Sequence, residues 1–123
     1  MAEGKVNNVS LIDRSTNITL SSSGCTFEGD TILRRFGKIV TMSFFGTITF
    51  NAANTYYAIC NIPYGYRPIE RFCFYAASYL SATYKGDCRF SFVNDTTTLY
   101  TSSEFSGTKA TVGFITSWIT ADN

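Results

Sequence analysis

The sequence contains no histidine among its 123 residues. Histidine is the commonest general base and the commonest metal ligand, and it activates the nucleophile in Ser-His and Cys-His hydrolases. The sequence therefore excludes these two classes of hydrolase. Its four cysteines are spaced too widely to form a Cys-x-x-Cys pair. We predict no metal site and no cofactor.

Charge is also scarce. Charged residues make up 15% of the chain, against about 25% in a typical soluble domain, and the net charge is +1. A nucleic-acid-binding surface or a polybasic tail needs concentrated positive charge, and a membrane span needs about 18 consecutive apolar residues. Neither feature is present, so we expect no nucleic-acid partner and no membrane insertion.

The start of the sequence lacks the charged and apolar segments that make up a secretory signal peptide. We therefore expect a protein that is not secreted by this route and is assembled in the cytoplasm, where cysteines remain reduced thiols. The length favours one domain. Residues 1–30, the least hydrophobic part of the chain, are predicted to be a lead-in or connector, and residues 31–123 are predicted to form the domain.

What the sequence does have is alternation. From Lys38 to Phe50 every even position is apolar or glycine, and this period of two predicts a strand. Gly46 within it predicts a bulge or a bend. Further strands are predicted over residues 56–60, 80–85, 88–94, 97–101 and 110–120, with Gly86 and Asp87 as a hairpin turn. Residues 69–80 also fit helical spacing, but their aromatic side chains favour a strand over residues 72–78.

Short strands separated by turns predict an all-β fold, either a sandwich or a barrel. We predict a single antiparallel β-sandwich of jelly-roll type. The last strand is apolar on both faces, with Ile115 and Ile119 opposite Val112, Phe114 and Trp118. The outer face of a small sandwich normally contacts water. We therefore predict that Ile115 and Ile119 lie in an interface between identical subunits; a central position in a barrel is the alternative.

Several segments of the sequence resemble a known family. They are residues 33–41 (Leu-Arg-Arg-Phe-Gly-Lys-Ile-Val-Thr), residues 46–49 (Gly-Thr-Ile-Thr), residues 61–68 (Asn-Ile-Pro-Tyr-Gly-Tyr-Arg-Pro) and the closing strand that ends Ser-Trp-Ile-Thr at residue 120. Together they resemble the C-terminal head domains of bacteriophage and prophage tail fibres and receptor-binding proteins. The resemblance covers residues 33–123.

This resemblance implies a homotrimeric β-rich knob at the tail tip of a virion. Such a knob would bind a saccharide or protein on a bacterial surface and would contact other tail or baseplate proteins. The alternative is a purely structural virion component, such as a head-decoration or baseplate scaffold protein, with no receptor.

Candidate ligand contacts follow from the chemistry of sugar recognition, which needs a flat aromatic face and a few fixed polar groups. Such residues gather at predicted turns and at the Pro-Tyr-Gly-Tyr-Arg-Pro corner. The candidates are Tyr56, Tyr57, Tyr64, Tyr66, Arg67, Tyr79, Tyr84, Asp87, Arg89 and Asn94. At the corner, a structural role is favoured instead, with Tyr66 packed and Arg67 paired with a neighbouring strand or subunit.

Enzymatic cleavage of a glycan would need two carboxyl groups about 5 to 9.5 Å apart. The available pairs are Glu28 with Asp30 and Glu70 with Glu104. Nothing in the sequence places the members of either pair together. We therefore predict no catalytic residues and no enzymatic activity.

Overall fold

The computed structural model describes residues 3–6 and 9–123, with side chains described from Ile12 onwards. The described residues form nine strands and no helix, and hence no helix that could cross a membrane. The strands are β1 (Glu3–Val6), β2 (Val9–Ile18), β3 (Cys25–Phe36), β4 (Ile39–Phe50), β5 (Tyr57–Asn61), β6 (Cys73–Leu80), β7 (Thr83–Ser91), β8 (Thr98–Ser103) and β9 (Ala110–Ile119). The all-β prediction is confirmed.

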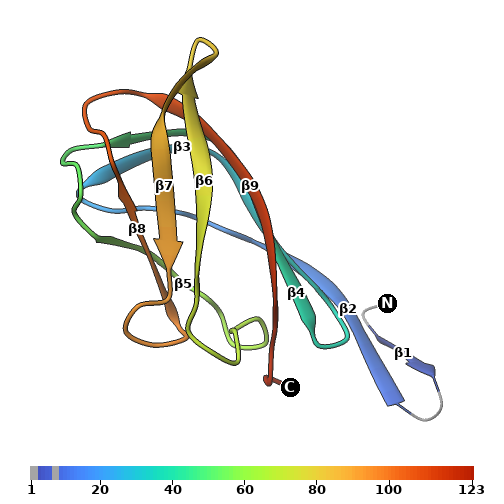
Figure 1. The fold of residues 1–123 in the computed structure, drawn as a ribbon. Helices are drawn as coiled ribbons and strands as arrows, with labels where there is room; N and C mark the ends of the chain where they lie inside the picture. Colours follow the sequence, from blue (N-terminus) through green and yellow to red (C-terminus); the bar gives the residue numbers. More distant parts are fainter. Residues whose placement is uncertain (1–2, 7–8) are drawn as a thin grey trace.

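All the strands pair antiparallel in one sheet, in the order β1-β2-β3-β4-β9-β6-β7-β8-β5. The sheet curls around its own core (Figure 1). Its two halves are joined where β9 meets β6, over the pairs Ser78–Val112 and Tyr79–Thr111. The sequence predicts a jelly-roll sandwich; the structure shows the coarser feature, an antiparallel all-β fold in one curled sheet.

The core fills the space that the curled sheet encloses. The inward residues of β4 are buried along the strand, as its period of two predicts: Val40, Met42, Phe44, Ile48 and Phe50. Beyond their two shared pairs β9 and β6 diverge, and aromatic rings occupy this region. The ring centroid of Phe114 lies 5.0 Å from that of Phe74 and 4.8 Å from that of Phe90. Such pairs stabilise a fold by about 0.5–1.5 kcal/mol beyond their burial.

Of the bulge or bend predicted at Gly46, the bulge is wrong. β4 keeps its register with both β3 and β9 through this residue. Glycine is required there by a close approach of the two backbones, because a Cβ on Gly46 would lie 1.9 Å from the carbonyl oxygen of Glu28. The glycine therefore lets β3 and β4 pair without interruption.

The predicted hairpin turn at Gly86 and Asp87 is also wrong. The turn lies at Ser81 and Ala82, which both have positive φ. Gly86, with a φ of 126°, lies instead at an irregularity in the pairing of β6 and β7. The predicted strand over residues 80–85 is therefore wrong as well: it contains the turn, and Thr83 begins β7, which continues through Gly86 and Asp87 to Ser91.

The strand prediction for residues 72–78 is confirmed by β6, and the four cysteines are free thiols, as predicted. The predicted boundary between residues 30 and 31 lies within β3. Residues 9–18 and 25–30 are thus strands of the same sheet as the rest of the chain. Residues 1–2 and 7–8 of the predicted lead-in lie outside the described residues.

Candidate functional site

Aromatic and polar side chains form neighbouring rows on the outer face of β6, β7 and β8. The register places Tyr75 on β6 beside Arg89 on β7, and Arg89 beside Ser102 on β8. Next to the turn between β6 and β7, Tyr79 pairs with Tyr84, and their ring centroids lie 5.8 Å apart. The sheet thus collects side chains that are up to 27 positions apart in the sequence, from Tyr75 to Ser102.

Tyr56 joins this region from the loop before β5. The Nη1 of Arg89 donates a hydrogen bond to the hydroxyl of Tyr56, and the guanidinium lies 5.5 Å from the centroid of the Tyr56 ring. The ring remains 44% exposed. We call the adjoining hollow, of about 250 Å³, the Tyr56 pocket; it is lined by Asn54, Tyr56, Tyr75, Asp87, Arg89, Ser102, Ser103 and Glu104.

The pocket holds its acidic groups in a hydrogen-bonded arrangement. The hydroxyl of Tyr84 donates to Oδ1 of Asp87 at 2.7 Å, and this bond is the main reason that the pKa of Tyr84 is raised to about 12. The backbone N of Asp87 donates to Oε1 of Glu104 at 3.3 Å. Tyr84 therefore stays neutral at physiological pH and helps to fix the carboxylate of Asp87.

The corner at residues 63–68 is bound to the end of the chain. The carboxylate of Asp122 accepts hydrogen bonds from the backbone N of Gly65 and Arg67 and from the guanidinium of Arg67, at 2.9–3.2 Å. The bonds from the Arg67 side chain are the main cause that lowers the pKa of Asp122 to about 2. Tyr66 is buried, and its backbone oxygen accepts a hydrogen bond from the indole of Trp118 at 2.6 Å.

This geometry gives Tyr66 and Arg67 the structural roles that the sequence favours at this corner. Tyr64 is 62% exposed, and the guanidinium of Arg67 lies 4.7 Å from its ring centroid. Tyr64 does not line the Tyr56 pocket. The corner and the pocket are therefore two separate groups of the predicted residues.

The remaining candidates divide between the core and the surface. Tyr57 packs against the core, and its ring occupies the space beside Gly24. Asn94 donates a hydrogen bond to the hydroxyl of Tyr100 at 3.1 Å and lines no part of the Tyr56 pocket. Tyr84 contacts Asp87 and Tyr79 lies opposite Tyr84 in the register, but neither tyrosine lines the pocket. The pocket thus contains Tyr56, Asp87 and Arg89 of the predicted set.

Five members of the pocket were not among the ligand contacts predicted from the sequence: Asn54, Tyr75, Ser102, Ser103 and Glu104. One pattern could have found Tyr75, because it lies four residues before Tyr79 and alternation places both on the same face of a strand. No comparable pattern marks the other four as ligand contacts. Their position beside the pocket depends on how β8 and the loop before β5 pack against β7.

The predicted interface residues lie on an outer face without charge. Ile115 is 77% exposed and Ile119 57% exposed, and Phe45 on the neighbouring strand is 73% exposed. We call the outward side chains of β4 and β9 the uncharged face: Ile39, Thr41, Ser43, Phe45, Thr47, Thr49, Thr111, Gly113, Ile115, Ser117 and Ile119. Within the described residues, the second apolar stripe of β9 is therefore not buried by the chain itself.

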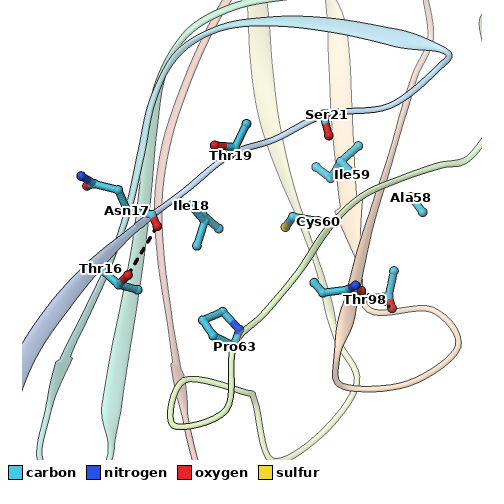
Figure 2. A pocket seen from close by; sticks show the side chains of 11 residues that line it. Thr16, Asn17, Ile18, Thr19, Ser21, Ala58, Ile59, Cys60, Pro63 and Thr98 are labelled. Atoms are coloured by element: carbon cyan, nitrogen blue, oxygen red, sulfur yellow. Dashed lines mark hydrogen bonds between the residues drawn. The ribbon is translucent and has the colours of Figure 1, made fainter.

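A second hollow lies where the two ends of the curled sheet approach each other (Figure 2). Its walls are residues 16–19 at the end of β2 and residues 58–61 of β5, and its volume is about 620 Å³. Between them the backbone N of Ser21 donates to the oxygen of Ile59 at 2.9 Å. The lining residues carry no charge, and none of the predicted contact residues is among them.

This second hollow offers little reactive chemistry. Burial raises the pKa of the Cys60 thiol to about 12, so it is a poor nucleophile at neutral pH. Glu70 and Glu104, one of the two carboxylate pairs considered from the sequence, line different hollows, and Glu28 pairs with Lys109 at 2.6 Å. The described residues hold no cluster of His, Cys, Asp and Glu that could bind a metal ion.

The Tyr56 pocket is the better candidate for a ligand site, because it combines an exposed ring with fixed charged groups. Comparison with known proteins adds no name to this geometry: no protein-family model and no curated protein matches the chain. The geometry of the site and the sequence motifs are therefore the grounds for a functional proposal.

Proposed function

We propose that this chain is a non-enzymatic head domain of the bacteriophage tail-fibre type, and that its Tyr56 pocket binds a saccharide on a bacterial surface. The main support is the convergence of the rings of Tyr56 and Tyr75 with Arg89, Asp87 and Glu104 in one hollow. An aromatic face contacts the apolar side of a sugar ring, while carboxylates and a guanidinium bind its hydroxyl groups. The pocket supplies both kinds of group.

The polar groups of the pocket are held in place before any ligand arrives. Arg89 is fixed by the Tyr56 hydroxyl, and Asp87 is fixed by the Tyr84 hydroxyl. Groups that are already ordered lose less conformational entropy on binding, which raises the affinity for a small ligand. This arrangement favours recognition of a saccharide over a purely architectural role for these side chains.

The tail-fibre assignment depends on the sequence resemblance, and the self-association that it implies fits the uncharged face. In this proposal three copies associate through that face, and the curled sheet acts as a sandwich-like knob at the tail tip of the virion. Other tail or baseplate proteins are further partners. Burial of Ile115, Ile119 and Phe45 between copies would remove exposed apolar surface from water.

A purely structural virion component is the second candidate. It is favoured by the same uncharged face, because a scaffold protein needs only contacts with its own copies and with neighbouring virion proteins. It makes no use of the Tyr56 pocket. The two functions are therefore separated by whether changes in the pocket alter binding to bacteria.

Binding of the fluorescently labelled chain to whole bacteria and to arrays of bacterial wall polysaccharides tests the proposal. We expect retention on at least one polysaccharide, and a reduction of at least tenfold in Tyr56→Ala and Arg89→Ala. Tyr64→Ala is the matched control, because it removes an exposed tyrosine that lies outside the pocket. It should bind as the unaltered chain does.

Two outcomes would contradict the proposal. Absence of binding to every bacterium and polysaccharide tested would favour the scaffold function. Loss of binding in Tyr64→Ala with no change in Tyr56→Ala would place the ligand site at the corner instead of the pocket.

A further inference from the structure

We propose that the saccharide recognised by the Tyr56 pocket carries a free amino group, which is protonated when bound. This inference deepens the proposed function and rests on it. It concerns the charge of the ligand, which the aromatic rings alone do not specify. It follows from the groups that line the pocket and from the interactions they already make.

The carboxylates of the pocket have no cationic partner within the described chain. The ion pairs among the described residues are Arg67 with Asp122 and Lys109 with Glu28, and neither involves Asp87 or Glu104. Asp87 accepts one hydrogen bond from the neutral Tyr84 hydroxyl, and Glu104 accepts one from a backbone N. A carboxylate can accept about four hydrogen bonds, so both groups retain acceptor capacity.

The one cation that lines the pocket is already engaged by aromatic groups. Arg89 donates to the hydroxyl of Tyr56 and lies over its ring, and it stands beside Tyr75 across the sheet. Two carboxylates and one guanidinium leave the lining with a net negative charge. Because opposite charges attract, this pocket favours a cationic sugar and disfavours a uronic acid.

An ammonium group matches the remaining chemistry of the pocket. It donates three hydrogen bonds and accepts none, and the carboxylates of Asp87 and Glu104 can each accept further hydrogen bonds. The carbon atoms next to it can pack against tyrosine, and the ammonium itself is attracted by the face of an aromatic ring. An N-acetylated sugar offers a single amide N–H at the same position and no positive charge.

The size of the pocket indicates how much of a glycan it encloses. Its volume of about 250 Å³ lies below the roughly 300–1,000 Å³ of pockets that enclose drug-sized ligands. A single sugar residue is thus the unit that fits, with the rest of the glycan outside. The charge of that one residue then dominates recognition.

Paired oligosaccharides test the inference. The probes are hexosamine tetramers of the gluco and galacto series, each as the free amine and as the N-acetylated form, and the corresponding hexuronate tetramers. We expect a free-amine probe to bind at least tenfold more tightly than its N-acetylated partner by calorimetry, and the hexuronates to bind most weakly. Raising the salt concentration should weaken binding of the amine more than that of the N-acetylated form.

Variants connect this preference to the two carboxylates. Glu104→Gln and Asp87→Asn should each reduce the ratio of amine to N-acetyl affinity by at least threefold. Glu28→Gln is the control, since Glu28 is a carboxylate that lies outside the pocket and is paired with Lys109. Glu104→Gln leaves the bond between Tyr84 and Asp87 in place, so it remains informative if Asp87→Asn disturbs the pocket.

The outcomes separate this inference from the proposed function. Equal affinity for the amine and N-acetyl forms, with binding lost in Tyr56→Ala, would overturn the inference and leave saccharide binding intact. Tighter binding of a hexuronate would also overturn it. Absence of binding to all these probes and to every bacterial polysaccharide would overturn both.

Discussion

At the scale of single residues, the most connected side chain of the corner is Asp122. It accepts hydrogen bonds from two backbone N–H groups and from the guanidinium of Arg67, and only 12% of its side chain is exposed. These bonds favour the ionised carboxylate. Burial opposes them, but the pKa is still lowered from 3.8 to about 2.

We predict that the free energy of unfolding decreases when the pH is lowered from about 4 to about 2. A group whose pKa is lowered by folding stabilises the fold above its unfolded-state pKa, here 3.8, and this contribution is lost as the pH falls through the folded-state value. The loss is roughly 2 kcal/mol, at about 1.4 kcal/mol per pKa unit. Urea unfolding at a series of pH values measures it.

Asp122→Asn provides the control for this prediction. The variant should be less stable than the unaltered chain at neutral pH by a similar amount, because the amide cannot form the charge-assisted bonds with Arg67. Its free energy of unfolding should also lack the part of the decrease between about pH 4 and about pH 2 that protonation of Asp122 causes in the unaltered chain. A variant with the full acid dependence would show that other carboxylates are responsible.

Arg35 illustrates what residue-level sequence reasoning cannot reveal. Its side chain is only 1% exposed, although arginine is rarely buried unless it is paired. Its guanidinium donates to backbone oxygens of Gly37, Gly65 and Asp122, at separations of 2, 30 and 87 positions along the chain. The tertiary fold brings Gly65 and Asp122 to Arg35, and no sequence pattern reveals these contacts. In the sequence, Arg35 is marked only as one residue of a segment that resembles the tail-fibre family.

At the scale of the strands, β3 and β4 approach closely at Gly29 and Gly46, which are partners in the register. A Cβ on Gly46 would meet backbone atoms of Glu28 and Gly29, and backbone cannot move aside as a flexible side chain can. The close pairing of these long strands therefore depends on glycine at this position.

We predict that Gly46→Ala lowers the free energy of unfolding by about 2–3 kcal/mol, as expected for overpacking. Gly107→Ala is the matched control: it has a φ of 73° and an added Cβ would meet nothing within 4 Å, so only backbone strain of about 1 kcal/mol is expected. Thermal and urea unfolding measure both. Equal losses in the two variants would show that the contact with Glu28 relaxes easily.

The strands also show which features of the fold the sequence patterns can predict. The period of two identified β4 because it records which side chains enter the core. It did not place the turn between β6 and β7, because Ser81 and Ala82 adopt positive φ without the glycine or asparagine that usually marks such a turn. The candidate site was predicted from turn residues, so Tyr75, in the middle of β6, was missed.

At the scale of the whole molecule, charge is distributed unevenly over the outer faces of the strands. β3 carries exposed Glu28, Asp30 and Arg34, while β7 carries charged side chains of both signs. The uncharged face lies between them in the sheet order. Protein interfaces commonly have an apolar centre and a polar rim, and identical residues meet near a symmetry axis, where like charges would repel. This distribution suits association of identical copies.

We predict that light scattering of the purified chain gives about three times its mass of 13.6 kDa. Ile115→Asp and Ile119→Asp should each dissociate or insolubilise the protein, because a buried, unpaired carboxylate at an interface is strongly unfavourable. Thr83→Asp is the control, since Thr83 is exposed on β7, outside the uncharged face. A monomeric unaltered chain would contradict the trimer. Ile115 would then be solvated, and Ile115→Asp should change the free energy of unfolding by no more than about 0.5 kcal/mol.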